Sequence, residues 1–243
     1  MSKYYRNMYP SYTQPSAEEL RQRAEASVMK AGKCGQKYEP VYVAGTKICQ
    51  RWWGRAWCRN LEQYADYTSR IGRGKRYVRA GAVLDLKIEA GHIIAKVQGS
   101  RQRPYQVEIR INPLTEKAVK KIQQQCVSKI KSLEELVAGE FPEELQHIFI
   151  GTDGLFPKPS DITFDCSCPD WACMCKHVAA VMYAVGVRLD ENPFYFFKLR
   201  GIHVDEFIDA AVEDRIESML KHAADKSSRI IDKKEVHDLF GVL

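Results

Sequence analysis

The sequence contains no apolar run of about 18 residues, the length that a membrane-spanning helix needs. Its first fifteen residues are rich in tyrosine and serine, and they lack the apolar stretch of a secretory signal peptide. Both absences predict a cytoplasmic protein, in which thiols stay reduced. Where its eight cysteines cluster, they are therefore expected to bind metal and not to form disulfides.

Signatures of catalysis are also missing. The sequence has no nucleophile motif, and the spacing of its carboxylates does not single out a catalytic acid/base pair. The stretch 72–75 is suggestive of a phosphate loop but lacks the Gly-x-x-x-x-Gly-Lys-Ser/Thr pattern. No two cysteines have the Cys-x-x-Cys spacing of the usual redox motif. We therefore expect a protein that is not an enzyme.

Positive charge is concentrated in the first part of the chain. Residues 1–150 carry 26 lysines and arginines against 15 carboxylates, whereas residues 151–243 carry 11 against 16. A basic half favours a polyanionic partner, which in the cytoplasm is usually nucleic acid. The alternative interpretation is an ordinary solubilising surface.

Hydrophobic periodicity predicts an α+β fold with N-terminal helices. Apolar residues alternate along residues 82–111, which predicts a three-stranded antiparallel meander with one buried and one wet face. Val83 and Asp85 belong to the wet face in this prediction. Ser16 and Glu19 match a capping box, so a helix is expected to begin there. Helices are predicted over residues 16–31, 50–68 and 114–138.

The second half is expected to fold as a small module followed by C-terminal helices. A stretch rich in glycine and proline, 151–160, marks the expected domain boundary. An amphipathic pattern predicts a long helix over residues 204–220. The predicted domains are a disordered tail at 1–15, a basic α+β domain at 16–150, a small module with the cysteine cluster at 151–200 and a helical segment at 201–243.

The segment from Cys166 to His177 contains four of the eight cysteines and one of the six histidines. Zinc binds four ligands in a tetrahedron, and three cysteines with one histidine form a closed set. Residues two apart on a strand face the same side, so Cys166 and Cys168 can share one ion. Cys175 and His177 then lie at the start of a helix, whose dipole favours thiolate. We predict a structural zinc ion (Zn2+) on these four residues, with Cys173 as a competitor of Cys175.

The spacing Cys-x-Cys, six residues, Cys-x-His resembles the signature of the SWIM zinc-finger family. Cys166, Cys168, Cys175 and His177 match the signature, and Cys173 is not part of it. The resemblance implies a ββα zinc module, binding of DNA or protein, and, for a bacterial subgroup, association with SNF2-type helicases. The segments that resemble this subgroup are 52–58, 73–79, 81–86, 99–105 and 192–197.

A basic segment between the second helix and the first strand is the expected nucleic-acid surface. It contains glycines and is predicted as a loop, which can follow a phosphate backbone while arginines face the phosphate oxygens. The alternative is a solvated loop whose charges pair with the acidic half. The predicted contacts are Arg70, Arg73, Lys75, Arg76 and Arg79, extended by Arg101 and Arg103 and, from the third helix, by Lys117, Lys120 and Lys121.

The expected function is therefore nucleic-acid binding, with DNA as the expected partner, by a zinc-binding protein of the SWIM type. The alternative is a protein adaptor for an SNF2-type helicase, with the aromatic run 194–197 as either a docking element or core packing. Trp53 and Trp57 are one helical turn apart and are expected in the core. Trp171 is expected to pack over the ion, or to contact a base or partner if it is exposed.

Overall fold

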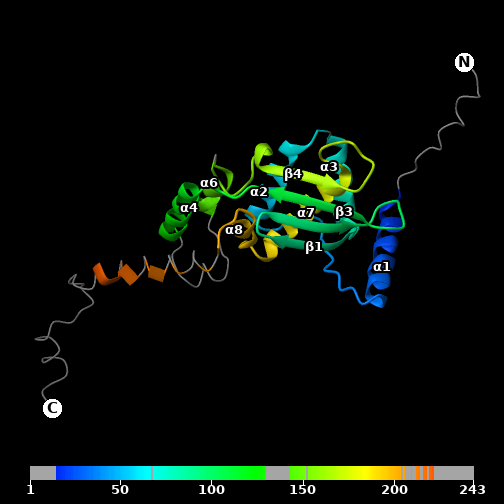
Figure 1. Cartoon of the computed structure of the whole chain (residues 1–243), viewed down its shortest axis with the longest axis horizontal. Helices are drawn as coiled ribbons and strands as arrows, with labels where there is room; N and C mark the ends of the chain where they lie inside the picture. Colours follow the sequence, from blue (N-terminus) through cyan, green and yellow to red (C-terminus); the bar gives the residue numbers. More distant parts are fainter. Residues whose placement is uncertain are drawn as a thin grey trace, which may run out of the picture.

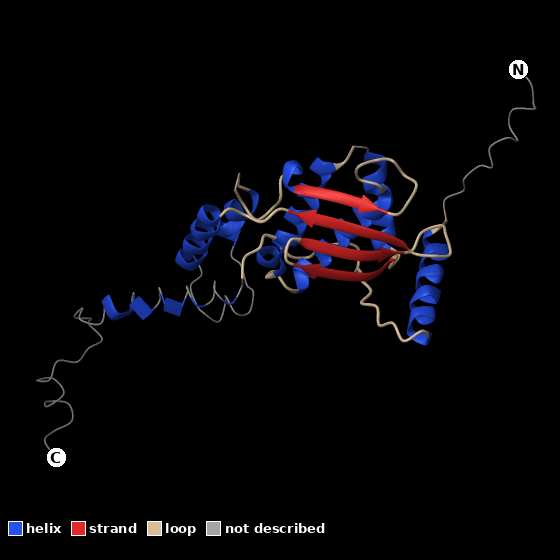
Figure 2. Ribbon diagram, in the orientation of Figure 1, coloured by secondary structure: helices blue, strands red, loops and turns tan. Residues whose placement is uncertain are grey.

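The computed structural model describes residues 15–66, 68–129, 143–151 and 153–203, and isolated positions between 205 and 221. The predicted tail except Pro15, the end of the predicted helix over 114–138 and most of the segment 201–243 lie outside the described residues. The described part is an α+β fold, as predicted. One antiparallel sheet of four strands carries helices on one face (Figures 1 and 2).

The first three strands of the sheet form the predicted meander, and a fourth strand extends it. The order is β1-β2-β3-β4, and all neighbouring pairs are antiparallel. In the last pair, Ile111 lies opposite Ile162 and Val107 lies opposite Cys166. The strands are β1 (Val83–Glu89), β2 (His92–Val97), β3 (Tyr105–Ile111) and β4 (Ile162–Cys166).

The prediction of a separate ββα zinc module is therefore wrong. β4, which carries the first predicted ligand, belongs to the main sheet. The physical reason is the edge of the meander: without β4, the edge of β3 would present unpaired backbone N–H and C=O groups. Alternation within each segment identifies the strands, but it does not reveal that β3 pairs with a strand so far along the chain.

The predicted wet face of β1 is interrupted by a β-bulge. The register shifts between Val83 and Asp85, so Val83 lies opposite Val97 and belongs to the core, contrary to the prediction. Asp85 is also buried, whereas Lys87 and Glu89 are exposed, as expected for a wet face. The segment 39–41 lies beside this part of β1: the Glu39 N–H donates to Asp85 Oδ1 (3.0 Å), and the Val41 N–H donates to the Val83 carbonyl (3.1 Å). This segment hydrogen-bonds to the β1 edge.

Helices of very different lengths complete the described fold. The Ser16–Glu19 capping box is confirmed: each side chain accepts the other residue's backbone N–H (Glu19 N–H to Ser16 Oγ, 3.1 Å; Ser16 N–H to Glu19 Oε2, 2.7 Å). None of the described helices combines the length and apolar composition needed to cross a membrane. The α-helices are α1 (Ala17–Lys33), α2 (Trp52–Leu61), α3 (Thr68–Arg79), α4 (Glu116–Lys129), α6 (Gln146–Ile150), α7 (Lys176–Glu191) and α8 (Tyr195–Leu199).

The basic segment that was predicted as a loop is a helix, α3, and the helix predicted over 50–68 ends earlier, at Leu61. Two glycines favour a loop because glycine lowers helix propensity. In the structure Gly74 has a packing role instead: a Cβ there would lie 2.6 Å from the Cβ of Ala179 in α7 and 3.0 Å from its carbonyl carbon. α3 and α7 therefore approach each other closely at Gly74, and burial of Tyr77 and Val78 adds to this interface.

Alanine at the two glycines of α3 is expected to change the free energy of unfolding in opposite directions. A Cβ at Gly72 would meet no atom within 4 Å, so Gly72→Ala is expected to stabilise the protein by up to about 1 kcal/mol through helix propensity. Gly74→Ala would force α3 away from α7 and is expected to cost about 1–3 kcal/mol. Urea unfolding followed by circular dichroism measures both. Equal effects of the two substitutions would contradict the α3–α7 contact.

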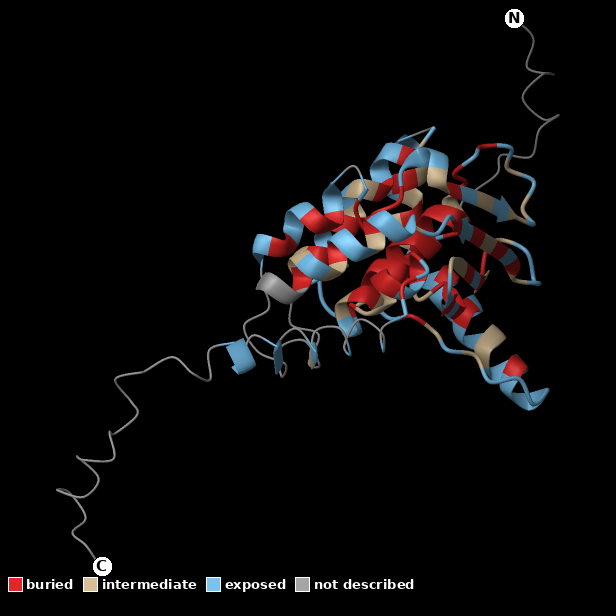
Figure 3. Cartoon of the chain, turned by 60° about the vertical axis from the view of Figure 1, so that its left-hand side comes forward, coloured by how far each residue is buried: buried red, intermediate tan, exposed pale blue. Residues whose placement is uncertain are grey.

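α7 is the centre of the hydrophobic core and is buried along almost its whole length (Figure 3). The expectation that Trp53 and Trp57 lie in the core is confirmed: their indole N–H groups donate to the α7 carbonyls of Leu189 (2.9 Å) and Met182 (2.8 Å). One core cluster extends from Leu20 to Ile202. The stretch 151–160 therefore does not separate two hydrophobic cores.

Candidate metal centre

Four side chains converge where the end of β4 meets the start of α7. One ligand atom from each of Cys166, Cys168, Cys175 and His177 lies within 4.8 Å of the others. His177 Nδ1 is 3.9 Å from the Sγ atoms of both Cys166 and Cys175. Ligand atoms on a tetrahedral zinc ion are roughly 3.5–3.8 Å apart. The four residues predicted from the sequence can therefore hold one metal ion with little rearrangement.

The backbone brings the first two cysteines to the centre by extending the sheet. Cys166 is the last residue of β4, and Cys168 follows two residues later on the same side. Between them, Ser167 continues the pairing with β3: its N–H donates to the Gln106 carbonyl (3.0 Å), and its Oγ accepts the Gln106 N–H (2.9 Å). The strand pairing therefore fixes the position of these two sulfurs.

The N-terminus of α7 supplies the other two candidate ligands, and their protonation favours metal binding. Cys175 is the N-cap residue, and its Sγ accepts the Val178 N–H (3.5 Å). A hydrogen bond from the Cys166 thiol lowers the pKa of Cys175 to about 4, with further lowering by His177 and the Val178 amide. The same bond, with burial, raises the pKa of Cys166. Burial lowers the pKa of His177, which favours the neutral imidazole that coordinates metals.

Two tyrosines and a glycine fix the orientation of the His177 ring. Tyr105 of β3 stacks on it, with ring centroids 4.3 Å apart, and Tyr77 of α3 meets it edge to face at 5.5 Å. A Cβ at Gly99 would lie 2.5 Å from Cε2 of Tyr105 and 3.0 Å from His177 Nε2. A side chain at position 99 would therefore push the imidazole out of place. No spacing in the sequence marks these three residues as neighbours of the metal centre.

Two carboxylates, one inside it and one outside it, anchor the loop of the predicted zinc site, residues 167–175, which we call the zinc loop. Asp170 forms an ion pair with Arg70 (Oδ2 to Nε, 3.0 Å) that is largely shielded from solvent. Asp66 accepts the backbone N–H groups of Cys173 (2.8 Å) and Met174 (3.4 Å). Arg70 was predicted to contact phosphate, but here it holds the loop.

The competition between the two cysteines of the zinc loop is decided by position. Cys173 is exposed and does not belong to the cluster, whereas Cys175 is buried within it. The neighbouring Trp171 was expected to pack over the ion. Its side chain is 79% exposed instead, which corresponds to the alternative of an indole that can contact a base or partner.

The remaining predicted nucleic-acid residues come from α3 and from the loop between β2 and β3. Lys75 forms an ion pair with Glu62 (3.0 Å) and lies over the Tyr183 ring. Arg101 is exposed and its guanidinium lies 5.7 Å from the Tyr105 ring centroid. The others are Arg73 and Arg76, which are half-buried, and Arg79 and Arg103, which are exposed.

The lysines Lys117, Lys120 and Lys121, which were expected to extend this surface, do not lie near it. They are exposed on α4, at the opposite end of the molecule from α1 and α3 (Figure 1). The aromatic run 194–197 is largely core packing: Phe196 and Phe197 are fully buried, and Phe196 contacts the ring of Trp57. It is therefore not an exposed docking element.

Comparison with known proteins adds little to this geometry. No family model matches the chain, and no solved structure matches it. The uncharacterized protein Rv2102 of Mycobacterium tuberculosis (strain ATCC 25618 / H37Rv) is 36% identical over 156 residues, which cover 63% of this chain and 56% of that protein. The chain therefore spans little more than half the length of this relative. The resemblance to the SWIM family stays a prediction that rests on the four ligands and their spacing.

Proposed function

We propose that this chain is a non-catalytic protein of the SWIM type, stabilised by zinc, that binds nucleic acid, in the first place DNA. The four ligands form a closed shell of three sulfurs and one nitrogen, which suits Zn2+. A closed shell leaves no coordination position for a reactive water molecule, so the proposed role of the metal is structural. In this role the ion holds β4, the zinc loop and α7 together.

The observation that carries the proposal is a groove beside the metal centre that has cations and an indole around it. The groove has a volume of about 320 Å³ and is bordered by the β2–β3 loop and the zinc loop. Arg101 and Lys176 line it, and Trp171, 79% exposed, follows the lining residue Asp170 directly. Arginines that pair with phosphates and an aromatic ring that stacks on bases are the usual means of binding single strands.

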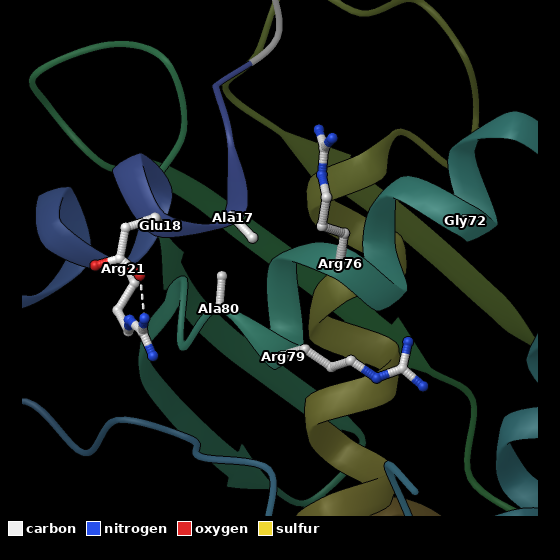
Figure 4. A pocket seen from close by; sticks show the side chains of 7 residues that line it. All are labelled: Ala17, Glu18, Arg21, Gly72, Arg76, Arg79 and Ala80. Atoms are coloured by element: carbon white, nitrogen blue, oxygen red, sulfur yellow. Dashed lines mark hydrogen bonds and ion pairs between the residues drawn. The ribbon is translucent and has the colours of Figure 1, made fainter. Parts of the chain in front are cut away.

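Cations of α3 extend this surface toward α1. A hollow of about 290 Å³ between the two helices is lined by Arg21, Arg76 and Arg79, and by Glu18, which pairs with Arg21. The guanidinium groups of Arg76 and Arg79 reach out from α3 in different directions (Figure 4). Such an arrangement suits successive phosphates of a backbone better than one small anion. Arg70 and Lys75 are left out of the proposed contact set because each has a carboxylate partner.

Removing three cations of this surface is expected to weaken nucleic-acid binding and its dependence on salt. The test variant combines Arg79→Gln, Arg101→Gln and Arg103→Gln, three exposed arginines of α3 and the β2–β3 loop. For each phosphate that is no longer neutralised, the slope of log affinity against log salt should become shallower by about 0.7–0.9, so the triple variant should reduce it by about 2–3. Fluorescence anisotropy with labelled single- and double-stranded DNA and RNA, between 50 and 200 mM salt as the suggested range, measures this slope.

The matched control removes the same charge at the opposite end of the molecule. Lys117→Gln, Lys120→Gln and Lys121→Gln change three exposed lysines of α4. This control is expected to keep the wild-type slope. If both triple variants lost affinity equally, binding would follow net charge, and the proposed surface would be wrong.

The alternative, an adaptor for an SNF2-type helicase, has less support. Its candidate docking element contains two phenylalanines that are 1% and 0% exposed, Phe196 and Phe197, so they cannot anchor a partner without opening the core. The adaptor function stays a prediction without a defined surface. Nucleic-acid binding is preferred because its surface is exposed.

A further inference from the structure

Two cysteines far from the metal centre form a close pair that their spacing in the sequence did not suggest. Cys49 lies in the loop before α2, and Cys58 lies in the last part of α2. Their Sγ atoms are 3.3 Å apart. Cys49 is buried, whereas Cys58 is half-buried. The nine-residue separation differs from every common redox or metal motif, so only the fold brings the two thiols together.

The surroundings keep the two sulfurs next to each other. Both face Gly186 in α7: a Cβ at that position would lie 3.0 Å from the Cys49 sulfur and 3.2 Å from the Cys58 sulfur. The loop that carries Cys49 is fixed by Asp190, also in α7, whose carboxylate accepts the backbone N–H groups of Gln50 and Arg51. The glycine makes room for two thiols, and the aspartate limits the movement of the loop.

We infer that Cys49 and Cys58 are an oxidation site that closes to a reversible disulfide when the protein meets a hydroperoxide. A disulfide needs an Sγ–Sγ distance of about 2.05 Å, so the sulfurs must approach by little more than one ångström. Side-chain rotation supplies most of this movement. The bond would join the 48–51 loop covalently to α2, on the side of α7 away from its metal-binding N-terminus.

The chemistry needs one equivalent of hydroperoxide and no group from the metal centre. The Cys58 thiol, which is the more accessible of the two, loses its proton, and its sulfur attacks the peroxide oxygen. The O–O bond breaks and Cys58 becomes a sulfenic acid; the leaving hydroxide or alkoxide takes up the released proton and departs as water or an alcohol. The Cys49 sulfur then attacks the Cys58 sulfur, and the sulfenic oxygen leaves as water with the Cys49 proton. The hydrogen bond that the Cys49 thiol donates to the Cys58 sulfur, together with burial, raises the pKa of Cys49, which suits a thiol that reacts second.

Trypsin places the two cysteines in separate short peptides, which makes the test direct. Cleavage after Lys47, Arg51, Arg55 and Arg59 releases Cys49 in residues 48–51 and Cys58 in residues 56–59. The full-length, metal-loaded protein is treated with hydrogen peroxide, alkylated with iodoacetamide under denaturing conditions and digested without reductant. Mass spectrometry is expected to find the two peptides joined, two hydrogens lighter than their sum, and separated again by dithiothreitol.

Variants assign the order of the steps. Cys34→Ser and Cys173→Ser each remove an exposed thiol and are expected to leave the linked peptides unchanged. In Cys49→Ser, dimedone is expected to trap the sulfenic acid on residues 56–59, and absence of the adduct would overturn the role of Cys58. Wild-type protein whose two peptides remained separately alkylated after oxidation, or became linked to other cysteines, would overturn the proposal without any variant.

Discussion

Substituting Cys175 by serine is expected to remove the bound zinc and destabilise the whole described fold, whereas Cys173→Ser is expected to leave both unchanged. The two cysteines are separated by one residue, yet only Cys175 lies in the four-ligand cluster; Cys173 is exposed. Serine is close to cysteine in size, but its hydroxyl does not replace a thiolate as a zinc ligand. The pair of variants therefore changes the same atom type at two neighbouring positions, and only one change affects the metal.

The effect is expected to extend beyond the zinc loop. Structural zinc contributes about 10–16 kcal/mol of apparent binding free energy in zinc-finger peptides, which is comparable with the whole stability of a typical domain, about 5–15 kcal/mol. Here Cys166 ends a strand of the main sheet, and Cys175 caps the central core helix α7. Loss of the metal is therefore expected to loosen the sheet and the helices together, and not the segment 160–200 alone.

Elemental analysis and thermal unfolding measure this prediction. Wild type and Cys173→Ser are expected to contain one zinc ion per chain, and Cys175→Ser none. A chelator added to wild type should lower the melting temperature, followed by circular dichroism, to that of Cys175→Ser. A chelated protein that kept its original melting temperature would show that the centre is not structural, even if zinc had been present.

The features that could be predicted from the sequence depend on residues that are close together along the chain. The four predicted metal ligands lie close together because two of them are two residues apart at the end of a strand and the other two are at the start of the next helix. The capping box of α1 and the alternation of β1 to β3 likewise depend on neighbours along the chain. In each case the interacting groups lie within one element or in adjacent elements, so the pattern itself contains the geometry.

What could not be read depends on contacts between distant segments. The segment of α3 was predicted as a loop because it contains two glycines, whose helix propensity is low. The reason for Gly74 is its close approach to Ala179 of α7, and the sequence alone does not show this contact. The pairing of β3 with β4 and the contact of Asp85 with the segment 39–41 have the same origin. Arg70 was predicted at a phosphate because its partner, Asp170, lies 100 residues away in the sequence. Surface charge alone does not distinguish the two roles.

Replacing Trp57 by alanine is expected to lower the stability of the protein substantially, and Trp171→Ala is its matched control. Trp57 is 1% exposed, donates to the Met182 carbonyl at 2.8 Å, and meets the rings of Phe156 and Phe196. Its removal leaves a large cavity against α7, at a cost of about 3–5 kcal/mol. Trp171 is 79% exposed, so the same substitution there is expected to change stability by no more than about 0.5 kcal/mol.

For nucleic-acid affinity the expected effects are reversed: Trp171→Ala should lower it, and Trp57→Ala should leave it unchanged. A base stacked on an aromatic side chain contributes about 1–3 kcal/mol, so Trp171→Ala should weaken single-strand binding roughly 5- to 150-fold. Trp57→Ala, measured at a temperature where it is still folded, should bind as wild type does, because its ring lies in the core behind the sheet. Urea unfolding and anisotropy on the same samples separate the effects. If Trp171→Ala bound every nucleic acid with wild-type affinity, the indole would not be a stacking platform, and binding would have to depend on the arginines of α3 and the β2–β3 loop alone.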